Sequence, residues 1–82
     1  MKKGTVKWFN NAKGYGFIND EKDPKKDIFV HYSQIVQDGY KTLREGEEVE
    51  FIDIYHEKGI QAHSVISLDR LREEELKKKD KE

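Results

Sequence analysis

The shortness of its apolar runs is the feature of this sequence that most limits its fold. The longest uninterrupted run, Ile28–Val30, has only three residues, and turn-forming residues separate the runs at short intervals. This pattern is typical of a small all-β domain. We predict five strands, at Lys3–Asn10, Gly14–Asn19, Asp27–His31, Glu48–Tyr55 and Gly59–Ser67.

The segments between these strands predict turns of different kinds. Residues 10–14 form a short hairpin connection, because asparagine and glycine tolerate the positive φ values of tight turns. Residues 20–26 contain the only proline, Pro24, and six charged residues, which indicates a solvated hairpin loop. Residues 33–46, with Gly39 and Gly46, form a connection long enough to cross between sheet edges.

Length and composition restrict the function classes. Eighty-two residues suffice for one small domain, which excludes large catalytic architectures. The chain has no cysteine, so a disulfide framework, a cysteine-ligated zinc and a thiol nucleophile are all excluded. With no long apolar block, we expect neither a membrane span nor a secretory leader. We therefore expect a cytoplasmic protein.

The net charge of −1 hides an uneven distribution. Residues 1–19 carry four lysines and no acid, whereas residues 27–57 hold eight acids against two bases. We interpret the acidic run Glu45, Glu47, Glu48 and Glu50 as a solvated turn and strand face that repels phosphate. A polyanionic ligand would thus be confined to the basic N-terminal region.

Period-2 alternation divides the apolar residues by strand face. One face carries mainly aliphatic side chains and is the predicted core: Val6, Ile18, Ile28, Val30, Val49, Phe51 and Val65. The opposite face of the second and third strands carries Tyr15, Phe17, Asp27, Phe29 and His31. Because the aliphatic face already supplies the core, we expect the aromatic face to point toward solvent.

An exposed row of rings suits base stacking, since every nucleobase has a π-face. Lys7 and Lys13 flank the row and can neutralise phosphates. Strict alternation groups Trp8 with Val6, so a bulge or bend is required to present Lys7 and Trp8 to one ligand. The rival interpretation is a small β-barrel module whose aromatic face grips a peptide or partner subunit.

Other chemistry has little support in the sequence. His31, His56 and His63 lack metal-type spacing, so we expect no metal site and no cofactor. Asp27 and His31 lie about 13 Å apart at strand rise, too far for an acid–base pair. No serine has a nucleophile-elbow context. We therefore expect no catalytic residues, and the protein is predicted not to be an enzyme.

Five segments together resemble the bacterial cold shock proteins. These are Lys7–Asn10, Lys13–Ile18, Asp27–Ser33, Gly39–Leu43 and Lys58–Ala62, and the likeness covers about residues 2–67. The resemblance implies a five-stranded antiparallel OB-type β-barrel that binds single-stranded RNA and DNA. It further implies an RNA chaperone that melts RNA structure passively and influences transcription, translation and the stress response. Pyrimidine-rich strands are candidate targets.

The resemblance also implies roles for individual residues. Base stacking is expected at Trp8, Tyr15, Phe17, Phe29, His31, Tyr32 and Tyr40. Backbone contacts are expected at Lys7, Lys13 and Lys58, with Asp27 accepting a hydrogen bond from a base edge. Phe9 has a secondary role, partly in the core. Ile60 stands where the family usually has proline, which leaves that loop one more amide donor.

The composition changes near Leu68, where twelve of the last fourteen residues are charged. We expect a binding domain at residues 1–68 and a charged tail at 69–82, either a short helix capped by Ser67 or disordered. The apolar residues Leu68 and Leu71 either dock on the barrel or leave the tail solvated. We expect a monomer, with a dimer through the tail or a strand exchange as the alternative.

Overall fold

The computed structural model describes residues 1–37, 39 and 41–72. Its elements follow the predicted order: β1 (Lys2–Asn10), β2 (Tyr15–Asp20), β3 (Asp27–His31), a 3-10 helix η1 (Tyr32–Gln34), β4 (Glu48–His56) and β5 (Gly59–Ser67). All five predicted strands are confirmed, with ends that differ by one residue at most. η1 was not predicted. Residues 68–72 form a helical turn directly after β5.

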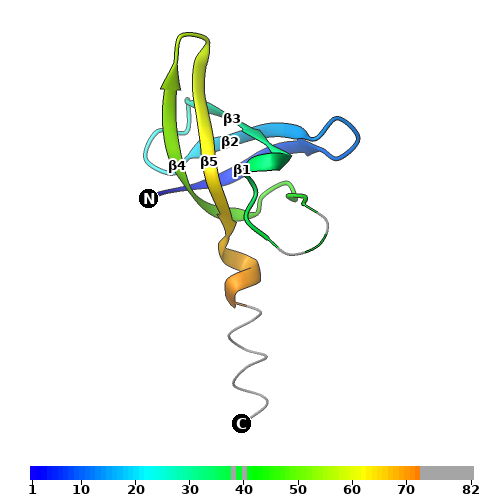
Figure 1. The fold of residues 1–82 in the computed structure, drawn as a ribbon. Helices are drawn as coiled ribbons and strands as arrows, with labels where there is room; N and C mark the ends of the chain where they lie inside the picture. The colour runs from blue at the N-terminus through cyan, green and yellow to red at the C-terminus, as the bar shows by residue number, and fades with distance from the viewer. Residues whose placement is uncertain (38, 40, 73–82) are drawn as a thin grey trace.

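The strands close into a barrel in the order β1-β2-β3-β5-β4 (Figure 1), which confirms the OB-type fold class. Four pairings are antiparallel, as predicted. The seam between β3 and β5 is parallel, so the prediction of a wholly antiparallel barrel is wrong at this one seam. Strand direction must alternate at each antiparallel pairing, and a closed ring of five strands therefore retains one parallel pair.

The inner face of the barrel carries the core. Every predicted core residue is buried, and Ile35, Leu43 and Ala62 complete the cluster. Ile18, Ile28 and Val30 of the central strands are fully inaccessible. Aliphatic side chains alternate inward along β2 and β3 because the strand period of two sends every second residue to the same face.

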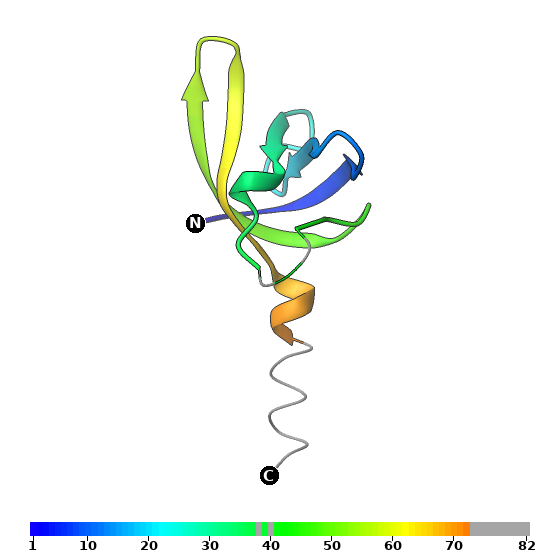
Figure 2. The ribbon, with the colours of Figure 1, turned by 45° about the vertical axis from the view of Figure 1, so that its right-hand side comes forward.

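Two of the three nine-residue strands, β4 and β5, lie side by side in the barrel. β4 and β5 form a hairpin whose turn projects beyond the other strands in both views (Figures 1 and 2), and the helical turn at 68–72 lies at the opposite end of β5. Within the described part of the chain, no helix is long and apolar enough to cross a membrane.

Candidate nucleic-acid interface

Four aromatic side chains from three neighbouring strands meet on the outer face of the barrel. Trp8 of β1 lies 5.8 Å from Tyr15 and 5.3 Å from Phe17, measured between ring centroids. Phe29 of β3 lies 5.8 Å from each of the same two rings. Tilted and edge-on pairs at these separations attract one another. We call these four residues the ring cluster.

A β-bulge places Trp8 in the ring cluster. Val6 pairs with Ile18, but Trp8 pairs with Phe17, so Lys7 is the extra residue of β1 and has no partner in β2. The bulge resets the alternation, which turns Val6 inward and Trp8 outward. The bulge required to present Lys7 and Trp8 on one face is therefore confirmed.

Glycine at position 16 lets β1 approach β2 at this point. Gly16 pairs with Phe9, and a Cβ atom added there would lie 2.2 Å from the carbonyl oxygen of Trp8. No side chain fits that space, so the backbone register next to Trp8 depends on this glycine.

The ring cluster remains partly open to solvent although its rings support each other. Trp8 is 38% exposed, and Tyr15, Phe17 and Phe29 are half-buried. The prediction that the aromatic face lies outside the core is confirmed.

His31 and Tyr32 extend the aromatic surface where β3 ends. Their ring centroids are 4.5 Å apart, and Tyr32 is 48% exposed. The His31 side chain caps η1, because its Nδ1 accepts the backbone N–H of Ser33 at 3.3 Å. The same ring nitrogen lies 2.8 Å from the Ser33 hydroxyl oxygen. These contacts fix the orientation of the imidazole beside Tyr32.

Lys7 and Asp27 face each other beside the ring cluster. The Lys7 Nζ lies 3.3 Å from a carboxylate oxygen of Asp27, and both side chains are about half exposed. This pairing was not predicted from the sequence. It joins the bulge of β1 to the start of β3, and it means that a phosphate must compete with Asp27 for the Lys7 ammonium.

The other two predicted basic residues line separate hollows at the margins of the rings. Lys13 and Tyr32 border a hollow of about 440 Å³ that also includes Gly14. Lys58 borders one of about 270 Å³ together with Phe17, Asp27 and Phe29. The structure thus brings each predicted lysine next to predicted aromatic residues, although the residues come from different strands and loops.

Phe9 and Tyr40 complete the set of predicted residues. Phe9 is partly buried and packs against the core, in agreement with its expected secondary position. Tyr40 lies outside the described residues.

The chain that forms this barrel, with its lysines around an outward ring cluster, matches a known protein family. Residues 2–68 match the family model described as the 'Cold-shock' DNA-binding domain. The chain belongs to the cold shock domain family. Members of this family bind nucleic acids and are not enzymes.

Individual relatives agree with this assignment. The chain is 54% identical over 68 residues to cold shock protein CspA of Staphylococcus haemolyticus and, equally, of Staphylococcus aureus. The match covers 83% of this chain and 100% of each relative. A solved structure of Drosophila Unr CSD456 has the same fold, with a TM-score of 0.67 and 24% identity. That match covers 82% of this chain and 26% of the Drosophila one.

The structure adds residues that the sequence did not single out. Gln61 pairs with Phe29 across the parallel seam and lines the hollow with Lys58. Lys41 and Asn11 line the hollow with Lys13. Lys41 and Gln61 belong to segments that carried the resemblance to cold shock proteins, and this was the available signal. The pairing of β3 with β5 places Gln61 beside Phe29, and the folded loop brings Lys41 to the hollow that Tyr32 lines.

One residue of the acidic run was interpreted wrongly. Glu47 was expected in a solvated face, but its side chain is buried, with 6% exposure. Its carboxylate accepts hydrogen bonds from the Ser67 hydroxyl and the Arg44 backbone N–H, and it lies 3.6 Å from Arg70 Nε. A buried carboxylate requires such partners. Glu45 and Glu48 are exposed as expected, and Glu50 is half-buried.

Proposed function

We propose that this cold shock domain binds single-stranded RNA and DNA by stacking bases on the ring cluster. The observation that carries the proposal is the division of β2 and β3: their inner residues fill the core, while their outer aromatic residues face solvent with Trp8. Each base stacked on an aromatic side chain is worth roughly 1–3 kcal/mol. Lys7, Lys13 and Lys58 supply phosphate contacts around the rings.

The remaining predicted residues have defined places in this proposal. His31 and Tyr32 continue the stacking surface, and Tyr40 is assigned to it by the resemblance alone. The carboxylate of Asp27 accepts a hydrogen bond from a base edge and gives a mild base preference. Its pairing with Lys7 holds both groups beside the rings before the ligand arrives.

An RNA chaperone activity follows from binding alone. A protein that binds exposed bases stabilises the melted state by mass action, so no nucleotide hydrolysis is required. We propose that this passive melting influences transcription and translation in the cytoplasm. The binding unit is residues 1–68 acting as a monomer, and residues 69–82 form an appended tail.

Trp8 provides the test, because it is the only tryptophan and belongs to the ring cluster. A single-stranded oligothymidine should quench its fluorescence, and the matching duplex at the same salt concentration should quench it far less. Stacking requires an accessible base face, which duplex DNA does not offer. An equal response to the two ligands would contradict the proposal.

The rival protein-interaction module uses the same aromatic surface, so charge separates the two. Lys7→Glu combined with Lys13→Glu should abolish binding to oligothymidine, because both lysines face the strand's phosphates. Lys3→Glu combined with Lys22→Glu is a matched control that makes the same change in charge at exposed positions. Unchanged oligothymidine binding in the Lys7/Lys13 variant would favour the rival.

A further inference from the structure

A groove of about 660 Å³ lies between η1 with its following loop and the helical turn at residues 68–72. Its walls include Ser33, Val36, Lys41, Ile66, Arg70 and Leu71. Two of these, Arg70 and Leu71, follow the residues that match the cold shock domain. The start of the C-terminal extension therefore forms one wall of the groove. We call this hollow the tail groove.

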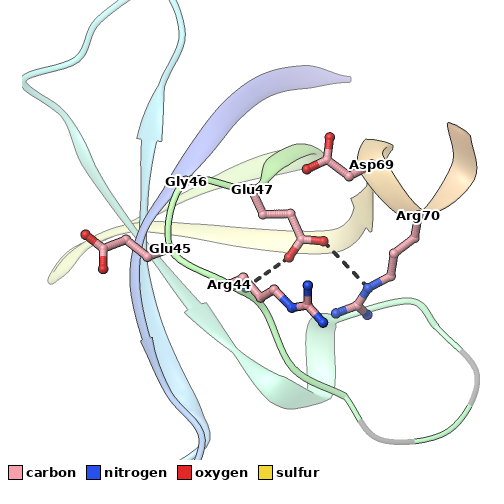
Figure 3. Close-up of a pocket in the computed structure, with 6 residues that line it drawn as sticks. All are labelled: Arg44, Glu45, Gly46, Glu47, Asp69 and Arg70. Carbon is pink, nitrogen blue, oxygen red and sulfur yellow. Dashed lines mark hydrogen bonds and ion pairs between the residues drawn. The ribbon is translucent and has the colours of Figure 1, made fainter. Parts of the chain in front are cut away.

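Arg70 fixes that wall to the barrel. Figure 3 shows the Glu47 carboxylate directed toward Arg70 and the backbone of Arg44, with the Arg70 Nε 3.6 Å from Glu47. The Nη2 of Arg70 donates a hydrogen bond to the carbonyl oxygen of Thr42 at 2.9 Å. Ser67 caps the turn, since its hydroxyl accepts the backbone N–H of Arg70 at 3.3 Å. The wall is thus held by both side-chain and backbone contacts.

Lys41 connects the tail groove to the nucleic-acid interface. It lines the tail groove and also the hollow that contains Lys13 and Tyr32. Next to it, the Thr42 hydroxyl donates to the side chain of Asn11 in the β1–β2 turn. The loop carrying Lys41 is therefore tied to the β1–β2 turn on one side and to Arg70 on the other.

The chemistry of the tail groove suits a polyanionic strand with apolar faces. Lys41 and Arg70 supply positive charge, although Arg70 shares its charge with Glu47. Val36 is 57% exposed and Leu71 is 43% exposed, so both present apolar surface to a base or sugar. Single-strand binding surfaces combine a cationic track with such contacts.

We propose that a nucleic-acid strand leaving the stacking surface at Tyr32 passes Lys41 and continues into the tail groove. The extension then lengthens the binding site beyond that of the domain alone. This inference rests on the proposed function. Continuity through Lys41 favours a strand over a peptide, because a ligand on the stacking surface reaches the groove without leaving positive charge.

The test compares two ligand lengths and two variants. Oligothymidines of about six and about twelve nucleotides are suitable, since OB folds cover roughly 4–16 nucleotides. Val36→Glu adds a negative charge to the groove wall. Ile52→Glu adds the same charge on β4, at a residue that is 44% exposed and lines neither hollow. Trp8 quenching reports binding, and thermal unfolding verifies that each variant is folded.

Val36→Glu should lower the affinity for the longer oligothymidine about fivefold, which is the scale of one exposed charge interaction. The affinity for the shorter oligothymidine should be unchanged. Ile52→Glu should alter neither affinity. Leu71→Glu should repeat the result from the opposite wall. The inference is overturned if Val36→Glu and Ile52→Glu have the same affinity for the longer oligothymidine, or if Val36→Glu lowers the affinity for both lengths equally. Absence of hexamer binding by the unmodified protein would instead contradict the proposed function.

Discussion

The two faces of β2 and β3 differ in what their side chains contact. On the inner face, Ile18, Ile28 and Val30 are fully buried and pack against residues from every side of the barrel. On the outer face, Phe17 and Phe29 pack against each other and against further rings of the ring cluster, and both remain half-buried. Residues one position apart in the sequence therefore differ in role: the inner ones stabilise the fold, and the outer ones form an aromatic surface that is partly open to solvent.

This difference shows why hydrophobicity alone would misplace the site. Phe17 and Phe29 are as apolar as the core residues, and a core of aromatic residues is common in small domains. What separates them is that the inner face is already filled by other side chains, which are mainly aliphatic. The proposed binding site rests on this apolar surface, which lies outside a complete core.

The largest effect on stability is expected from the inner face. Ile28→Ala should lower the free energy of unfolding by about 2–5 kcal/mol, because it removes buried methyl and methylene groups and leaves a cavity. Urea denaturation measures this loss. The affinity of the remaining folded protein for oligothymidine should be unchanged. A loss below about 1 kcal/mol would mean that this face is not the tightly packed core.

Phe29→Ala should have the reverse effect. Removing one stacking ring should cost roughly 1–3 kcal/mol of binding free energy, or about 5- to 150-fold in affinity. Its effect on unfolding should be smaller than that of Ile28→Ala. Tyr55→Ala is the control, since Tyr55 is an aromatic residue of β4 that is 63% exposed and outside the ring cluster. Equal losses of stability and binding in Phe29→Ala would return this ring to the core.

A smaller effect concerns the charges beside the outer face. With about three or four phosphate contacts, log affinity should fall against log salt with a slope near −2 to −3, at roughly 0.7 per contact. Asp27→Asn frees the Lys7 ammonium, so the slope should steepen by about 0.7. Titrations of oligothymidine at several salt concentrations measure both slopes. An unchanged slope would show that Asp27 does not hold the Lys7 ammonium away from the phosphates of the strand.

The smallest effect is expected at the start of β1, where Lys2 pairs with Asp53 of β4. A hydrogen bond from Lys2 lowers the pKa of the Asp53 carboxyl below its usual range, with Nζ 2.9 Å from the carboxylate. A carboxyl with a lowered pKa stabilises the fold above its unfolded pKa, about 3.9, and that contribution disappears as the pH falls through the folded value. The difference in urea stability between the unmodified protein and Asp53→Asn should therefore shrink below about pH 4. A constant difference would contradict the pairing.

The strands were predictable because their signals are local. Alternation and turn residues lie within a few positions of each other, so the strand limits and the inward residues could be derived from the sequence. η1 was missed because its cap is made by the His31 side chain, and histidine is not among the usual capping residues.

The site was predictable in part. The outer position of Tyr15, Phe17 and Phe29 followed from the alternation. The position of Trp8 did not, because it depends on whether β1 carries a bulge, and the bulge is a property of how β1 pairs with β2. The Lys7–Asp27 pair also depends on how the strands pair, since the two residues are twenty positions apart in the sequence.

The sequence by itself determined the five strands, the aliphatic core and the presence of an aromatic outer face, because each follows from short-range periodicity and turn chemistry. The tertiary structure alone decided which distant groups meet. It set the parallel β3–β5 seam that places Gln61 beside Phe29, and it buried Glu47 against Arg70. Such contacts depend on how the strands close into a barrel, which no local pattern encodes.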